Sequence, residues 1–85
     1  PVDEAVLEIL PVAKGQTVFK QGDAATAAYI LASGSIAIYR EIDGKQVPVT
    51  RIRKGEFFGE MAIIDGTPRR ATAVALEDCT LSLIA

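Results

Sequence analysis

The sequence predicts a mainly β domain: an antiparallel β-roll or barrel of the jelly-roll kind, with one short inserted helix. Glycines divide the 85 residues at intervals of about ten residues, as turns between short strands do. Between these glycines lie short β-prone or apolar segments, and residues 35–40 alternate with the period of a strand. One segment, which begins at Glu60, contains good helix formers instead.

The first strands are predicted from β-prone residues that end at turn residues. Residues 2–10 are compatible with one or two helical turns or with a strand, and we favour an extended chain from about Leu7. Residues 17–19 form the next strand, which stops at a Gln-Gly-Asp turn. Residues 29–31 form a third, which stops at a Ser-Gly turn.

A hairpin is predicted in the middle of the chain. Residues 35–40 alternate as a strand does, and Asp43-Gly44 then marks a tight turn that needs positive φ. The partner strand runs through residues 47–52. Pro48 lacks a backbone donor, so this strand is expected to lie at an edge or to carry a bulge there.

The last elements are the inserted helix and two strands. Residues 60–64 form the helix, which residues 65–68 end with turn chemistry. Residues 72–76 and 80–84 form the strands, separated at Glu77-Asp78.

Composition limits the function classes. The chain is 49% hydrophobic, enough for one packed domain over residues 1–85, and its net charge of −2 argues against a broad nucleic-acid-binding surface. It has no histidine, and its one cysteine, Cys79, is expected to be a buried small apolar residue rather than a nucleophile. No membrane-spanning run or signal peptide is visible, and both ends look cut from a longer chain.

Residues 58–72 are the strongest candidate for a binding site. Gly59 precedes the helix, whose free N–H groups and dipole attract an anion. Arg69 adds a charged fork for phosphate oxygens, and Glu60 can accept hydrogen bonds from a sugar hydroxyl. The segment therefore suits a small molecule that carries a phosphate and a hydroxyl.

Each of these side chains also has a simpler interpretation. Glu60 is either a surface residue that complements the helix dipole or a partly buried carboxylate with a partner. Arg69 is a phosphate clamp, a surface residue, or a cation that only neutralises Glu60. If Arg69 faces the pocket, strand alternation directs Arg70 to solvent.

The chain resembles the cyclic nucleotide-binding domains of kinase regulatory subunits, cyclic-nucleotide-gated channels and catabolite-activator-type regulators. The resemblance covers about residues 15–83. It rests on the following segments: Gln21-Gly22-Asp23, Ser33-Gly34-Ser35-Ile36, Phe58-Gly59-Glu60 with Ala62, Pro68-Arg69 and Ala71-Thr72. The last three resemble the family's phosphate-binding cassette.

The resemblance implies roles for individual residues. Glu60 would hold the ribose 2′-hydroxyl, Arg69 would bind the exocyclic phosphate oxygens, and backbone N–H groups would complete the cradle. The ligand-binding set is Gly59, Glu60, Met61, Ala62, Arg69, Arg70, Ala71 and Thr72. Ile38, Thr50 and Ile52 would line the wall beneath the purine, although simple core packing explains Ile38 and Ile52 equally well.

The chain departs from the family pattern in two places. Many members have alanine, serine or threonine where this chain has Arg70, which either adds a second cation or crowds the phosphate. The C-terminal lid helices of the family are absent from this sequence. The choice between cAMP and cGMP stays open.

The resemblance implies a non-catalytic, cytoplasmic regulatory module without cofactor or metal, which binds cAMP or cGMP. It would relay occupancy to an effector domain in the same or a partner chain, with no nucleic-acid contact and no membrane insertion of its own. The alternative is a family member that has lost its ligand and serves as an interaction domain. A cupin-like metalloenzyme is disfavoured because such barrels use histidines. The parent protein and its oligomeric state stay open.

Overall fold

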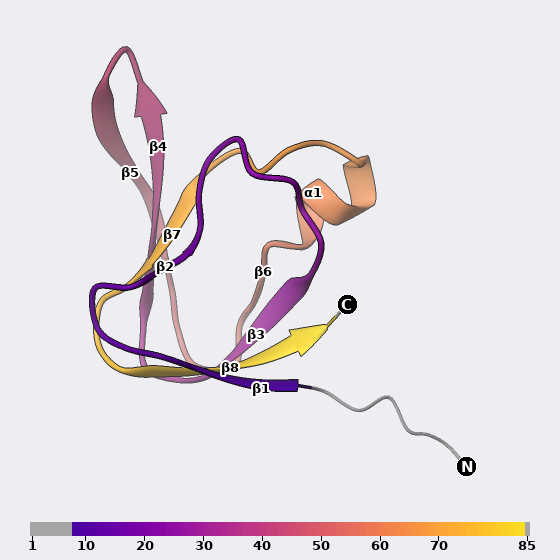
Figure 1. Cartoon of the computed structure of the whole chain (residues 1–85). Helices are drawn as coiled ribbons and strands as arrows, with labels where there is room; N and C mark the ends of the chain where they lie inside the picture. The colour runs from indigo at the N-terminus through magenta and orange to yellow at the C-terminus, as the bar shows by residue number, and fades with distance from the viewer. Residues whose placement is uncertain (1–7, 85) are drawn as a thin grey trace.

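A computed structural model of the chain describes residues 8–84. The strands are β1 (Glu8–Val12), β2 (Thr17–Phe19), β3 (Ala28–Ser33), β4 (Ile36–Ile42), β5 (Lys45–Ile52), β6 (Phe57–Phe58), β7 (Thr72–Ala75) and β8 (Cys79–Ile84), with helix α1 at Glu60–Asp65. In Figure 1, the strands around β1 and β8 lie along the bottom of the view, and those around β4 and β5 rise from them. The predicted mainly β roll is confirmed.

The eight strands form two four-stranded antiparallel sheets. One has the order β1-β8-β3-β6 and the other the order β2-β7-β4-β5. The extended start expected from about Leu7 is confirmed from Glu8, which pairs with Leu83. The rest of that expectation, over residues 2–7, lies outside the described part of the chain. Strand β6 was not predicted, because two residues are too short for a periodic pattern.

The core lies between the two sheets. Its fully buried large side chains are Leu31 from β3, Ile36 from β4 and Leu81 from β8. Full burial of one such side chain contributes about 1.5–3 kcal/mol. Cys79 is also buried in this core as a free thiol, as expected from the sequence.

The hairpin between β4 and β5 has the predicted turn. Asp43 and Gly44 have φ values of 52° and 78°. Pro48 lies on β5, an edge strand, and it pairs with Tyr39 while Thr50 pairs with Ile38, so one extra residue forms a bulge. Both features expected around this proline are present. In Figure 1 the hairpin projects away from the rest of the roll.

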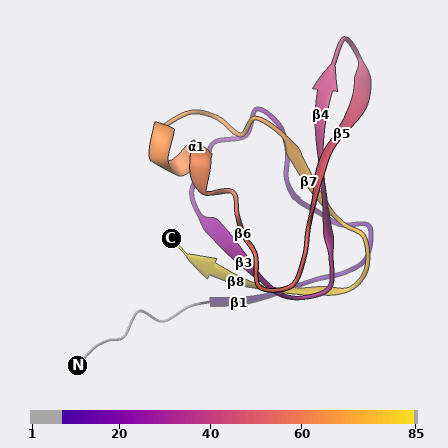
Figure 2. The same cartoon turned by 180° about the vertical axis from the view of Figure 1, so that it is seen from behind.

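Helix α1 lies between β6 and the segment that leads into β7. Figure 2, seen from behind, shows it on the opposite side of the roll from the β4–β5 hairpin. Glycines in the left-handed region cap both ends, Gly59 with φ 79° and Gly66 with φ 67°. At six residues, α1 is the one helix of residues 8–84. In this part of the chain, no helix has the length and apolar character that crossing a membrane requires.

Candidate functional site

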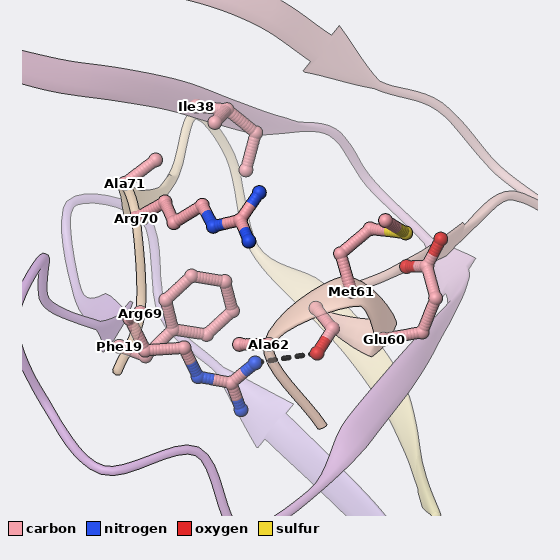
Figure 3. A pocket seen from close by; sticks show the side chains of 9 residues that line it. Phe19, Ile38, Glu60, Met61, Ala62, Arg69, Arg70 and Ala71 are labelled. Atoms are coloured by element: carbon pink, nitrogen blue, oxygen red, sulfur yellow. Dashed lines mark hydrogen bonds between the residues drawn. The ribbon is translucent and has the colours of Figure 1, made fainter. Parts of the chain in front are cut away.

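A pocket of about 250 Å³ opens between the start of α1 and the segment before β7. Figure 3 shows the side chains that border it. The lining residues are Phe19, Ile38, Gly59, Glu60, Met61, Ala62, Arg69, Arg70 and Ala71. The fold thus brings the predicted ligand-binding set to one cavity, with the exception of Thr72.

Gly59 is required by the backbone at this place. Its φ of 79° lies in the left-handed region, which residues with a Cβ rarely adopt. A Cβ there would lie 2.9 Å from Nη1 of Arg69 and 3.3 Å from the rings of Phe19 and Tyr29. The helix start has no side-chain cap, so the first N–H groups of α1 have no side-chain acceptor.

The backbone of Arg69 is held by the glycine turn after β2. The Arg69 N–H donates to the carbonyl of Asp23, and the Arg69 carbonyl accepts from the N–H of Gly22, both at 2.8 Å. These two bonds connect the Gln-Gly-Asp turn after β2 to the segment before β7, its neighbour in the sheet. They explain why the turn and the arginine, far apart in sequence, belong to one structural unit.

The side chain of Arg69 is a buried cation. It is 4% exposed, and it donates from Nη1 to the carbonyl of Gly59 and from Nη2 to the carbonyl of Ala27, each at 2.5 Å. Within residues 8–84, Nε has no hydrogen-bond partner and no carboxylate lies within salt-bridge distance of the guanidinium. The charge is therefore compensated by neutral groups alone.

An aromatic cluster packs against the guanidinium of Arg69. Cζ of Arg69 lies 4.1 Å from the ring centroid of Phe19 and 5.8 Å from that of Tyr29. The Tyr29 ring stacks in turn on Phe58, with 5.3 Å between centroids. Phe19 was not among the predicted site residues. The sequence showed it only as the end of a strand, and its place beside Arg69 depends on the pairing of β2 with β7.

Glu60 lies at the first position of α1 and is partly buried. In Figure 3 its side chain extends beside Met61 and away from the guanidinium of Arg69. Within the described residues, the single salt bridge joins Arg70 and Asp65, so Glu60 is not paired with Arg69. The interpretation of Arg69 as a cation that only neutralises Glu60 therefore has no support in the geometry.

Arg70 borders the same pocket as Arg69 but is exposed. Its Nη2 lies 2.6 Å from Oδ2 of Asp65, and the two side chains are 58% and 34% exposed. As strand alternation predicted, Arg70 is exposed whereas Arg69 is buried, although strand β7 begins only at Thr72 and Arg70 also borders the pocket. Figure 3 shows the guanidinium of Arg70 turned toward the pocket near Ile38.

Of the three residues expected to line the wall beneath the purine, only one borders the pocket. Ile38 lines it, whereas Thr50 and Ile52 do not. Thr50 is exposed on β5, and Ile52 packs against the core. Thr72 also does not line the pocket; its Oγ1 accepts a hydrogen bond from the N–H of Gln21 at 3.0 Å.

The family model described as cyclic nucleotide-binding domain matches residues 9–85. A cAMP-dependent protein kinase regulatory subunit from Mucor circinelloides f. lusitanicus is 41% identical over 69 residues, which are 81% of this chain and 16% of that protein. A cyclic AMP receptor protein from Thermus thermophilus is 39% identical over 69 residues, 80% of this chain and 32% of that protein. The chain spans about a third or less of the length of these relatives.

Solved structures with a similar fold include cyclic nucleotide complexes. An EAL enzyme in its cAMP-bound and cGMP-bound forms matches with a TM-score of 0.88 and 40% identity in each case. Each match covers 92% of this chain and 21% of that chain.

Proposed function

This chain belongs to the cyclic nucleotide-binding domain family, and we propose that it is a non-catalytic regulatory module that binds a cyclic purine mononucleotide. Occupancy of the pocket would be relayed to an effector domain, in the same chain or in a partner chain. The relay would be a population shift, since a ligand changes a conformational equilibrium by its differential affinity for the two states.

The observation that carries this proposal is the buried guanidinium of Arg69. A charge removed from water is strongly disfavoured unless it is paired, and here two backbone carbonyls are its hydrogen-bond partners among the described residues. A phosphate in the adjacent pocket would supply the missing countercharge and accept from the guanidinium fork. Burial also favours the pairing, because a charged hydrogen bond is stronger at low dielectric.

The neighbouring groups suit the rest of such a ligand. The start of α1, which no side chain caps, adds backbone donors for phosphate oxygens next to Gly59. Glu60 is free of a cationic partner among the described residues, so its carboxylate remains available to a ribose hydroxyl. Ile38 and Met61 offer apolar surface to a purine.

Both cAMP and cGMP are candidate ligands. The relatives named above include a kinase regulatory subunit and a receptor named for cAMP, and the EAL enzyme is known in forms with either nucleotide. Nothing in the lining of the pocket distinguishes adenine from guanine by itself. The test must therefore include both nucleotides.

Titration calorimetry of the full chain with cAMP and with cGMP tests the proposal, and 5′-AMP serves as a noncyclic control. Arg69→Lys keeps the charge but loses the planar fork, and we expect it to weaken binding by at least about tenfold. The matched control is Arg40→Lys, since Arg40 is an exposed residue of β4 outside the pocket.

An unchanged affinity in Arg69→Lys would refute the role of Arg69 as a phosphate clamp. No heat and no thermal shift with either nucleotide would favour the ligand-free interaction module instead.

A further inference from the structure

The salt bridge between Arg70 and Asp65 crosses the turn that connects α1 to β7. Asp65 is the last residue of the helix, and Arg70 lies five residues later on the wall of the pocket. The contact is close, with 2.6 Å between Nη2 and Oδ2, and both side chains remain partly in water. It therefore places a carboxylate against a cation that borders the proposed ligand site.

The two arginines of the pocket differ in how they are held. Arg69 is buried and bonded to backbone carbonyls, which the chain cannot withdraw without a change of fold. Within residues 8–84, the guanidinium of Arg70 has one hydrogen-bonding partner, the side chain of Asp65. A second anion can take that place by rotation of side chains alone.

We propose that Arg70 is a second cation for the ligand phosphate, and that Asp65 competes with the phosphate for it. This inference rests on the proposed function of the pocket. Exposed ion pairs contribute only about 0–1 kcal/mol, so the exchange of one anion for another is energetically accessible. Asp65 then lowers the affinity of the site without contact with the ligand, and its removal frees Arg70 for binding.

The competition predicts opposite effects for the two residues. Asp65→Asn leaves the size of the side chain unchanged and removes the competing charge, so the Kd for cAMP should fall by about three- to fivefold. Arg70→Gln removes the second cation, so the Kd should rise by about five- to tenfold. In the double variant, Asp65→Asn should have no further effect, because its partner is absent.

The experiment is a double-variant cycle in the full chain, with Kd values for cAMP from titration calorimetry and with unfolding midpoints as a check of folding. Glu41→Gln is the control for a general change of net charge, since Glu41 is exposed on β4 and does not line this pocket. A Kd that falls equally for Asp65→Asn with and without Arg70, or for Glu41→Gln, would overturn the competition. So would weaker binding in Asp65→Asn, which would make the pair a structural support of the site.

The same titrations separate this inference from the proposed function. A wild-type chain that binds neither cAMP nor cGMP removes the basis of both. A wild-type chain that binds cAMP, with an unaltered Kd in Asp65→Asn and Arg70→Gln, overturns only the role of this pair.

Discussion

The guanidinium of Arg69 lies over the ring of Phe19, with 4.1 Å between Cζ and the ring centroid. Because Arg69 is only 4% exposed, this cation–π contact is largely desolvated. A desolvated cation–π contact is worth about 2 kcal/mol, and an exposed one about 0.5–1 kcal/mol.

Phe19→Leu should therefore weaken binding of cAMP by about three- to tenfold, because it keeps an apolar side chain but removes the aromatic face. Titration of the variant with a fluorescent cAMP analogue measures this. Phe57→Leu is the matched control, since Phe57 is 48% exposed and does not line the pocket. Equal affinities for the Phe19 variant and wild type would mean that the ring does not position Arg69.

Much of the fold was predictable because its signals are local. The Asp43-Gly44 turn needs only two residues with positive φ, and Pro48 indicates an edge strand or a bulge by its missing donor. The same holds for α1, whose two ends are capped by glycines. In each case the physical cause lies within a few residues of its effect.

The site was less predictable because its contacts are not local. Arg69 is bonded to Ala27, 42 residues away, and it stacks on Phe19, and neither partner is marked in the local sequence. The alternation rule correctly separated exposed Arg70 from buried Arg69, but it did not predict that Arg70 also borders the pocket, because β7 begins only two residues later. Thr50 and Ile52 depended on the orientation of β5, which periodicity alone does not determine.

Gly59→Ala should impair both stability and binding. The left-handed φ of 79° strains an alanine by about 1–2 kcal/mol, and its Cβ would also displace Nη1 of Arg69. We expect a lower unfolding midpoint and at least about a tenfold loss of cAMP affinity.

Gly66→Ala provides the matched control at the other end of the same helix. Gly66 has a φ of 67°, but a Cβ there meets no atom within 4 Å. Both variants should be less stable, because each places an alanine at a positive φ. Only Gly59→Ala should also lose affinity for cAMP. A similar loss of affinity in both would show that helix strain, rather than contact with Arg69, controls binding.

Gly34→Ala should destabilise the fold without any involvement of the pocket. Its Cβ would lie 2.6 Å from Sγ of Cys79 and 2.7 Å from the carbonyl of Asp78, in a backbone with φ 95°. Gly22 has nearly the same φ, 93°, and open space around it. In urea unfolding, Gly34→Ala should therefore lose at least about 1 kcal/mol more than Gly22→Ala, because only Gly34→Ala adds overpacking to the strain. Equal losses of unfolding free energy in the two variants would mean that the backbone at Asp78 and Cys79 shifts to accommodate the methyl group.

The role of Glu60 can be tested by a substitution in the protein and by removal of the 2′-hydroxyl from the ligand. If its carboxylate accepts a hydrogen bond from the ribose 2′-hydroxyl, the bond to a charged group is worth about 1.5–3 kcal/mol, and Glu60→Gln should weaken binding of cAMP by about tenfold or more. For the wild-type chain, 2′-deoxy-cAMP should show a similar loss. For the Glu60→Gln chain, cAMP and 2′-deoxy-cAMP should differ by less than about threefold, because the charged acceptor is already gone.

Kd values from calorimetry for the four combinations of chain and ligand give the coupling between Glu60 and the 2′-hydroxyl directly, with Glu41→Gln as the control for a lost surface charge. Equal ratios of the two ligands in both chains would show that Glu60 acts on binding without contact with the 2′-hydroxyl.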